Sequence, residues 1–208
     1  DINETIWYQM KERFEYSIEL KSNTRKVKHS LKSNQLFHGL KFSKGTKDFD
    51  GIINHLRKQT NQQIENEIAI TASSIANNNV SEWGPYNSIQ YDNQKYFASK
   101  VQTNSWICFE FKNHRIIPTH YTIQSQCYGG HAPINFKIEI LNDKSEWEEI
   151  DRQNGAPFGQ EKLKTLTFSI TEDRQKETKS IRLTLTGKNS NGCDQLVMNS
   201  IEFFGYLL

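Results

Sequence analysis

The chain has 208 residues, of which 12% are aromatic, and its mean hydropathy is −0.75. The aromatic content excludes disorder throughout, because disordered chains lack aromatic and β-branched residues. The length suits one large domain, or one domain with a small appendage. No stretch approaches the roughly eighteen consecutive apolar residues that a membrane helix needs, so we expect no transmembrane segment. A formal net charge of +2 is too small to indicate a specific nucleic-acid partner.

Residues 1–41 predict a helical and basic N-terminal arm, which holds eight Lys or Arg against five Asp or Glu. Residues 4–20 are expected to form a helix, because their apolar side chains recur at steps of three and four. These side chains are Ile6, Trp7, Met10, Phe14 and Ile18. The basic cluster that follows could dock on an acidic protein surface or a phosphate backbone, or be a solvated linker. Its members are Arg25, Lys26, Lys28 and Lys32.

Residues 42–208 predict an all-β domain. Apolar and polar residues alternate in a series of segments, which cover residues 68–72, 106–111, 121–124, 136–140, 165–170 and 181–185. Such alternation means that a strand has one buried and one solvated face, as in antiparallel sheets. Two such sheets packed face to face form a sandwich. We therefore expect an antiparallel β-sandwich.

One further helix is expected between residues 49 and 60. Ile52, Ile53 and Leu56 have helical spacing, and Asp48 or Asp50 could cap the start of the helix. We expect this helix to close one end of the sandwich.

The three cysteines predict a reducing environment. An odd number of cysteines does not fit a secreted domain built on disulfides, so we interpret Cys108, Cys127 and Cys193 as free thiols. Cys108 falls in the middle of a predicted strand, where cysteines are typically buried and inert.

An ordered set of segments resembles a known family. The segments cover residues 70–74, 106–111, 136–139, 181–183 and 201–205, with Trp147 and Ile150 between the third and fourth. With them, residues 45–208 resemble the coagulation factor V/VIII type C, or discoidin, domain. Residues 50–53, 118–123 and 186–189 look like an intracellular branch of this family, which is common in protist multidomain proteins and often follows a BTB-type domain.

This resemblance implies a jelly-roll sandwich of galactose-binding type without catalytic activity. Extracellular members bind glycans, lipid head groups or proteins through loops at one end. The cysteine pair that commonly ties the ends of secreted members is missing here, and Gln124 stands where a basic residue is expected in the intracellular branch.

Two kinds of predicted loop alternate along the chain. The loops around residues 74–105, 126–131, 152–159 and 187–192 are long and rich in Gly, Asn and aromatic residues, whereas those at 112–115, 142–145 and 171–179 are mostly charged. If the strands alternate in direction, the first set lies together at one end and the second set lies at the other end. Aromatic, Asn and His side chains suit recognition of sugars or protein surfaces, although they could also make turns and seal the end of the sandwich. The candidate ligand-binding residues are Trp83, Tyr86, Tyr128, His131, Arg152, Asn189 and Asn191.

Two metal sites are conceivable from the residue types. Zinc would need ligands from the scattered Cys and His residues, but no close Cys-x-x-Cys pair supports such a site. Calcium prefers oxygen ligands, which Asp92, Asn93 and Glu202 could supply. Alternatively, Glu202 could hydrogen-bond to the backbone of a loop.

No nucleophile, phosphate-loop or metalloprotease motif is present, so we do not expect an enzyme. Two function classes remain. The main interpretation is a cytoplasmic, protein-binding scaffold domain within a larger cytoskeletal or ubiquitin-ligase assembly. The alternative is a lectin-like domain that binds a glycan or another small polar ligand.

Overall fold

The computed structural model describes residues 40–43, 45 and 47–208. The helix predicted over residues 4–20 and the basic cluster after it lie outside the described residues, so both stay predictions. The helices and strands, in chain order, are β1 (Leu40–Phe42), α2 (Ile52–Gln59), η1 (Ile64–Asn66), β2 (Ile68–Ala72), η2 (Ala76–Asn78), α3 (Val80–Trp83), η3 (Pro85–Ile89), β3 (Phe97–Ala98), β4 (Trp106–Phe111), β5 (Ile116–Gln124), β6 (Asn135–Leu141), β7 (Trp147–Asn154), β8 (Thr165–Ser169), η4 (Glu172–Arg174), β9 (Ser180–Leu185), β10 (Val197–Met198) and β11 (Ser200–Leu207).

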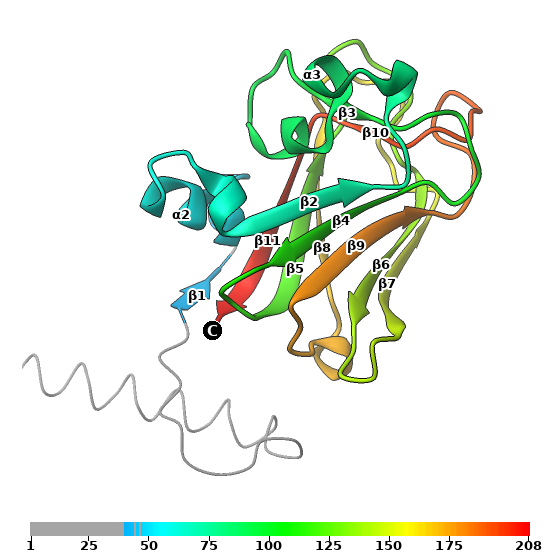
Figure 1. Cartoon of the computed structure of the whole chain (residues 1–208). Coiled ribbons are helices and arrows are strands. Elements are labelled where there is room, and N and C mark those ends of the chain that lie inside the picture. Colours follow the sequence, from blue (N-terminus) through cyan, green and yellow to red (C-terminus); the bar gives the residue numbers. More distant parts are fainter. Residues whose placement is uncertain (1–39, 44, 46) are drawn as a thin grey trace, which may run out of the picture. The chain divides into compact units, whose positions relative to one another are not determined.

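Two antiparallel sheets form the domain (Figure 1). One has the strand order β1-β11-β5-β8, the other has the order β2-β4-β9-β6-β7, and a short ribbon pairs β10 with β3. Neighbouring strands that are far apart in sequence, such as β11 and β5, show that the chain crosses between the layers. The prediction of an antiparallel jelly-roll sandwich is confirmed.

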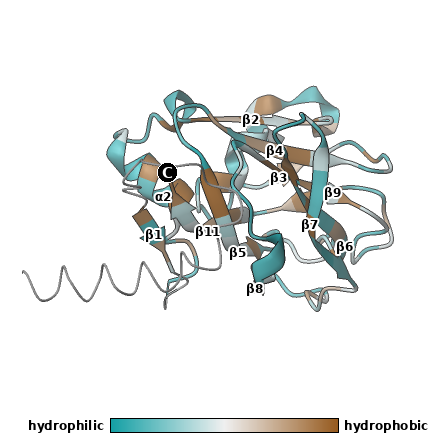
Figure 2. Ribbon diagram, turned by 90° about the horizontal axis from the view of Figure 1, so that it is seen from below, coloured by the Kyte–Doolittle hydropathy of each residue, from teal (hydrophilic) through white to brown (hydrophobic). Residues whose placement is uncertain are grey.

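The core lies between the two sheets. Ile107, Phe109 and Phe111 of β4 are fully buried, as the alternation predicts, and the Phe109 ring meets the Phe203 ring of β11 edge to face at 5.4 Å. Figure 2 shows the hydrophobic residues gathered along the strands, while the helices and turns carry more of the hydrophilic ones. Each aromatic ring buries a large apolar area, which lets this core form at a low overall hydropathy.

The first strand of the described residues is β1. Leu40 pairs with Leu207 and Phe42 with Gly205, so β1 is an edge strand of the four-stranded sheet. Lys41 places its ammonium 5.7 Å from the centre of the Tyr206 ring, which explains how a basic residue sits within this strand.

Helix α2 confirms the apolar spacing but corrects two expectations. Its buried residues Ile52, Ile53 and Leu56 pack beside β11 on the flank of the sandwich, not across one of its ends (Figure 1). Neither Asp48 nor Asp50 caps it, because the N-cap is Gly51 and has no side-chain hydrogen bond. A carboxylate from a distant strand takes that role.

Glu202 of β11 is the residue that caps α2. Its carboxylate is fully buried and accepts hydrogen bonds from the backbone N–H groups of Ile53 at 2.9 Å, Asn54 at 3.0 Å and Phe203 at 2.8 Å. The Tyr91 hydroxyl donates a fourth bond at 2.7 Å. Burial raises the pKa of Glu202, while these four donors oppose that effect.

A second buried carboxylate lies on the outer face of the five-stranded sheet. Glu139 is only 3% exposed; its oxygens accept from Nε of Arg182 at 2.8 Å, Nζ of Lys137 at 2.8 Å and Oγ1 of Thr184 at 2.7 Å. Arg182 in turn stacks 4.1 Å from the centre of the Trp147 ring. Burial alone would raise the pKa of Glu139, but the hydrogen bonds from these three residues outweigh it and hold that pKa at about 2.

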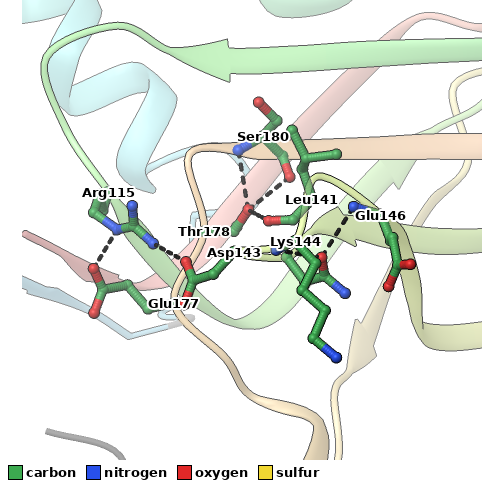
Figure 3. Close-up of polar contacts among 9 residues, drawn as sticks. Arg115, Leu141, Asp143, Lys144, Glu146, Glu177, Thr178 and Ser180 are labelled. Carbon is green, nitrogen blue, oxygen red and sulfur yellow. Dashed lines mark hydrogen bonds and ion pairs between the residues drawn. The ribbon is translucent and has the colours of Figure 1, made fainter.

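The charged turns lie together at one end of the sandwich, as predicted (Figure 3). Arg115 pairs with Asp143 at 3.3 Å and also with Glu177, which joins three different turns. The Thr178 hydroxyl donates to the carbonyl of Leu141 at 3.0 Å. Arg115, Asp143 and Glu177 therefore partner one another at this end.

Candidate functional site

The four long loops meet at the opposite end. The strand register brings together the strand ends that flank these loops. Trp106 pairs with Thr184, Asn135 with Asn154, and Gln124 with Thr165. The expectation that these loops share one end is confirmed. Antiparallel pairing is the physical reason, because successive strands run in opposite directions and alternate loops then emerge at the same end.

Three aromatic residues from two loops contact one another at this end. Nε1 of Trp83 donates a hydrogen bond to the Tyr96 hydroxyl at 3.1 Å, and the Tyr96 ring meets the Tyr128 ring edge to face at 6.0 Å. Tyr128 is 70% exposed, so most of its ring is free to contact a ligand. Burial raises the pKa of Tyr96, although the bond from Trp83 opposes it, so the Tyr96 hydroxyl stays protonated.

Polar side chains from two further stretches of loop also meet at this end. Nε2 of His131 lies 3.0 Å from Nδ2 of Asn191, and Nδ1 of His131 lies 3.4 Å from Nδ2 of Asn189. Asn189 is only 2% exposed, and its Oδ1 accepts from the backbone N–H groups of Asn191 and Cys193 at 3.0 and 3.1 Å. Asn189 therefore shapes the loop, while His131 and Asn191 lie at the surface.

Two glycines in the loop after β5 let the loop after β7 approach closely. Gly129 and Gly130 have φ angles of +79° and +68°, and a Cβ added to them would lie 2.6 and 2.8 Å from the backbone and side-chain oxygens of Gln160. Only glycine tolerates both the left-handed backbone and this close contact. Nε2 of Gln160 also donates to the carbonyl of Ser190 at 2.6 Å, which ties the loop after β7 to the loop after β9.

We call this surface the loop platform, which consists of Trp83, Tyr96, Tyr128, His131, Gln160 and Asn191. None of these residues is Asp, Glu, Lys or Arg. It combines an exposed aromatic ring with neutral hydrogen-bonding groups that a rigid sandwich positions, so it suits a neutral polar ligand with an apolar face.

Two predicted ligand-binding residues lie elsewhere. The Tyr86 hydroxyl accepts from the Ile70 N–H at 3.3 Å and donates to the Ile68 carbonyl at 3.1 Å, so it covers the free edge of β2. Arg152 lies on the outer face of the five-stranded sheet and forms two hydrogen bonds with Glu149, at 2.9 and 2.5 Å. Tyr86 in η3 is turned towards β2 by its two hydrogen bonds, and Arg152 lies on the outer face because of its position in β7.

Tyr96 and Gln160 are platform residues that the list of candidates did not contain. Tyr96 lies in the long loop around residues 74–105, which is rich in aromatic residues, so composition could have pointed to it. Gln160 carries no sequence signal, because its place depends on the close approach to Gly129 and Gly130.

Of the proposed calcium ligands Asp92, Asn93 and Glu202, the two carboxylates already accept hydrogen bonds from the protein. A carboxylate offers about four lone-pair sites, and Glu202 fills them with four protein donors. Oδ1 of Asp92 accepts instead from the N–H of Gln94 at 2.8 Å. Within residues 40–43, 45 and 47–208, no three His, Cys, Asp or Glu side chains are grouped so that they could hold a metal ion.

Comparison with solved structures identifies the fold. An F5/8 type C domain of a Bacteroides fragilis protein matches with a TM-score of 0.55 and 14% identity, covering 69% of this chain and 95% of that domain. The chain has the F5/8 type C fold. A Clostridium perfringens family 32 carbohydrate-binding module, solved with GalNAc-β-1,3-galactose, matches with a TM-score of 0.53 and 12% identity, covering 68% of this chain and 97% of that one.

A further matching structure is a chitosan-binding module from a Paenibacillus chitosanase/glucanase. It has a TM-score of 0.52 and 15% identity, and covers 67% of this chain and 95% of that one. No model of a protein family matches the chain, and no curated protein does. In the described part of the chain, no helix is long and apolar enough to cross a membrane.

Proposed function

We propose that this domain is a non-catalytic carbohydrate-binding module that reads a neutral glycan at the loop platform. The observation that carries the proposal is the Tyr128 ring, which is exposed and braced edge-on by Tyr96, in the same loop as His131, whose imidazole lies 3.0 Å from the Asn191 amide. A sugar presents an apolar face of C–H groups to an aromatic ring, while its hydroxyls bond to amide and imidazole groups.

The structures of similar fold support this assignment. One of them is a module solved in complex with GalNAc-β-1,3-galactose, and another is a chitosan-binding module. None of the six platform residues is Asp, Glu, Lys or Arg, which agrees with a neutral sugar.

The platform is tested by changing Tyr128→Ala and His131→Ala together. The variant should bind a glycan found on an array about thirtyfold more weakly, because an aromatic anchor is worth roughly 2 kcal/mol or more. Titration calorimetry measures the affinity, and the melting temperature should stay nearly unchanged because Tyr128 is largely exposed.

The matched control changes Lys144→Ala and Glu172→Ala at the charged end, which should leave the affinity unchanged. If only this control pair weakens binding, the platform is not the site. If the array shows no glycan bound at all, the carbohydrate function itself is wrong.

A protein-binding scaffold is the second candidate, and a cytoplasmic, intracellular-branch setting goes with it. The three free thiols, at Cys108, Cys127 and Cys193, favour it because they are compatible with a reducing compartment. Proximity labelling in cells would support this function if it repeatedly recovered one protein whose capture depends on Tyr128.

The thiols also carry a prediction of their own. Burial raises the pKa of Cys108 from 9.0 to about 11, although the charge of Arg182 opposes it. Because the thiolate is the reactive form, Cys108 should react with iodoacetamide at pH 8 at least tenfold more slowly than Cys127 and Cys193. Mass spectrometry of timed samples measures the three rates, and equal rates would contradict the buried environment.

A further inference from the structure

A groove on the flank of the domain is separate from the loop platform. It has a volume of about 380 Å³ and lies between α2, η1, η3 and the chain that follows η3. We call it the flank groove; its polar lining consists of Arg57, Gln62, Glu65, Tyr86, Gln90 and Asp92. The volume is in the range of small-molecule sites, which begins at about 300 Å³.

Arg57 is held in position on one wall of the groove. Its Nη1 donates to the carbonyl of Ile89 at 2.7 Å, its Nε bonds to the side-chain oxygen of Gln62, and its guanidinium lies 5.4 Å from the centre of the Tyr91 ring. In the part of the chain that the structure describes, Arg57 has no ion pair with Asp or Glu, and its Nη2 has no partner. A fixed guanidinium with an unused amino group is suited to binding a carboxylate.

Two carboxylates, those of Glu65 and Asp92, also line the flank groove. Asp92 uses only Oδ1 in a local turn with Gln94, and the side chain of Glu65 has no hydrogen bond or ion pair within the described residues. A purely anionic ligand such as phosphate would meet Arg57 but be repelled by these two carboxylates. A ligand that carries one carboxylate together with several hydrogen-bond donors would satisfy both kinds of group.

We propose that the flank groove is a second ligand site, which takes a small carboxylate-bearing molecule rich in hydrogen-bond donors. Its carboxylate pairs with Arg57, and its hydroxyl or ammonium donors bond to Glu65 and Asp92. Both a uronic acid and a free amino acid have this chemistry. The inference does not depend on the glycan function, because the two surfaces share no residue.

The test is to titrate the full chain with glucuronate, glutamate, glucose and inorganic phosphate, and to monitor each titration by NMR. At least one of the two carboxylates should bind, at least tenfold more tightly than glucose and phosphate, and the stronger of the two identifies the source. Arg57→Gln should weaken that binding at least tenfold. The platform variant Tyr128→Ala/His131→Ala should leave it unchanged.

A second variant covers the case in which Arg57→Gln does not fold. Glu65→Ala removes an exposed side chain without a partner within the described residues, and it should weaken binding at least threefold with the melting temperature unchanged. Glu146→Ala at the charged end is the matched control. The proposal is overturned if neither carboxylate binds, or if binding survives unchanged in each variant of the groove that folds.

Discussion

Replacing Glu202 with alanine should destabilise the domain by about 3–5 kcal/mol, because several buried donors lose their shared acceptor at once. The change leaves the backbone N–H groups of Ile53, Asn54 and Phe203 without an acceptor in the core. Each buried, unsatisfied donor costs roughly 1–3 kcal/mol. The loss also frees α2 and the chain around Tyr91 from β11, because one carboxylate joins all three.

Urea denaturation measures this effect. Glu202→Gln separates shape from charge: its amide nitrogen would face a donor, so about 2 kcal/mol should still be lost. Glu110→Gln is the control, because Glu110 is an exposed glutamate on β4 and should change stability by less than about 0.5 kcal/mol. A Glu202→Ala variant as stable as this control would rule out the capping role.

Glu139→Gln should cost about 3 kcal/mol at pH 7, and the cost should disappear in acid. The folded state holds the pKa of Glu139 at about 2, below its ordinary value of 4.5. A pKa that is lower in the folded state means that the unfolded chain binds the proton first. The stabilisation is therefore fully present above about pH 5 and is lost as the pH falls from there towards 2.

Stability curves measured between pH 2 and pH 7 test this sign. The wild type should lose stability through that window more steeply than Glu139→Gln, and the two curves should converge near pH 2. Glu146→Gln, at an exposed position, should follow the wild-type curve. Parallel curves for wild type and Glu139→Gln would show that the contacts with Arg182 and Lys137 do not set the pKa.

The binding end could be predicted only as a region. Composition pointed to the loops because Gly, Asn and aromatic residues concentrate there, and antiparallel pairing then placed them together. Individual residues did not follow, as Tyr86 and Arg152 show: their hydrogen bonds to β2 and to Glu149 depend on neighbours that are remote in sequence or on the outer face of a sheet. The same holds for Gln160, whose position depends on Gly129 and Gly130 in another loop.

The sandwich itself was determined by the sequence, because the alternation of apolar and polar residues is a local pattern. The period of two in β4 and β9 buries Ile107, Phe109 and Leu183 whichever strand pairs with them. The helical spacing of Ile52, Ile53 and Leu56 is equally local, so α2 was also predictable. The cap of α2 was not, because Glu202 lies about 150 residues further along the chain. The tertiary structure alone decides such contacts, since a charge buried at long range has no periodic pattern in the sequence and becomes favourable only when the fold brings its donors around it.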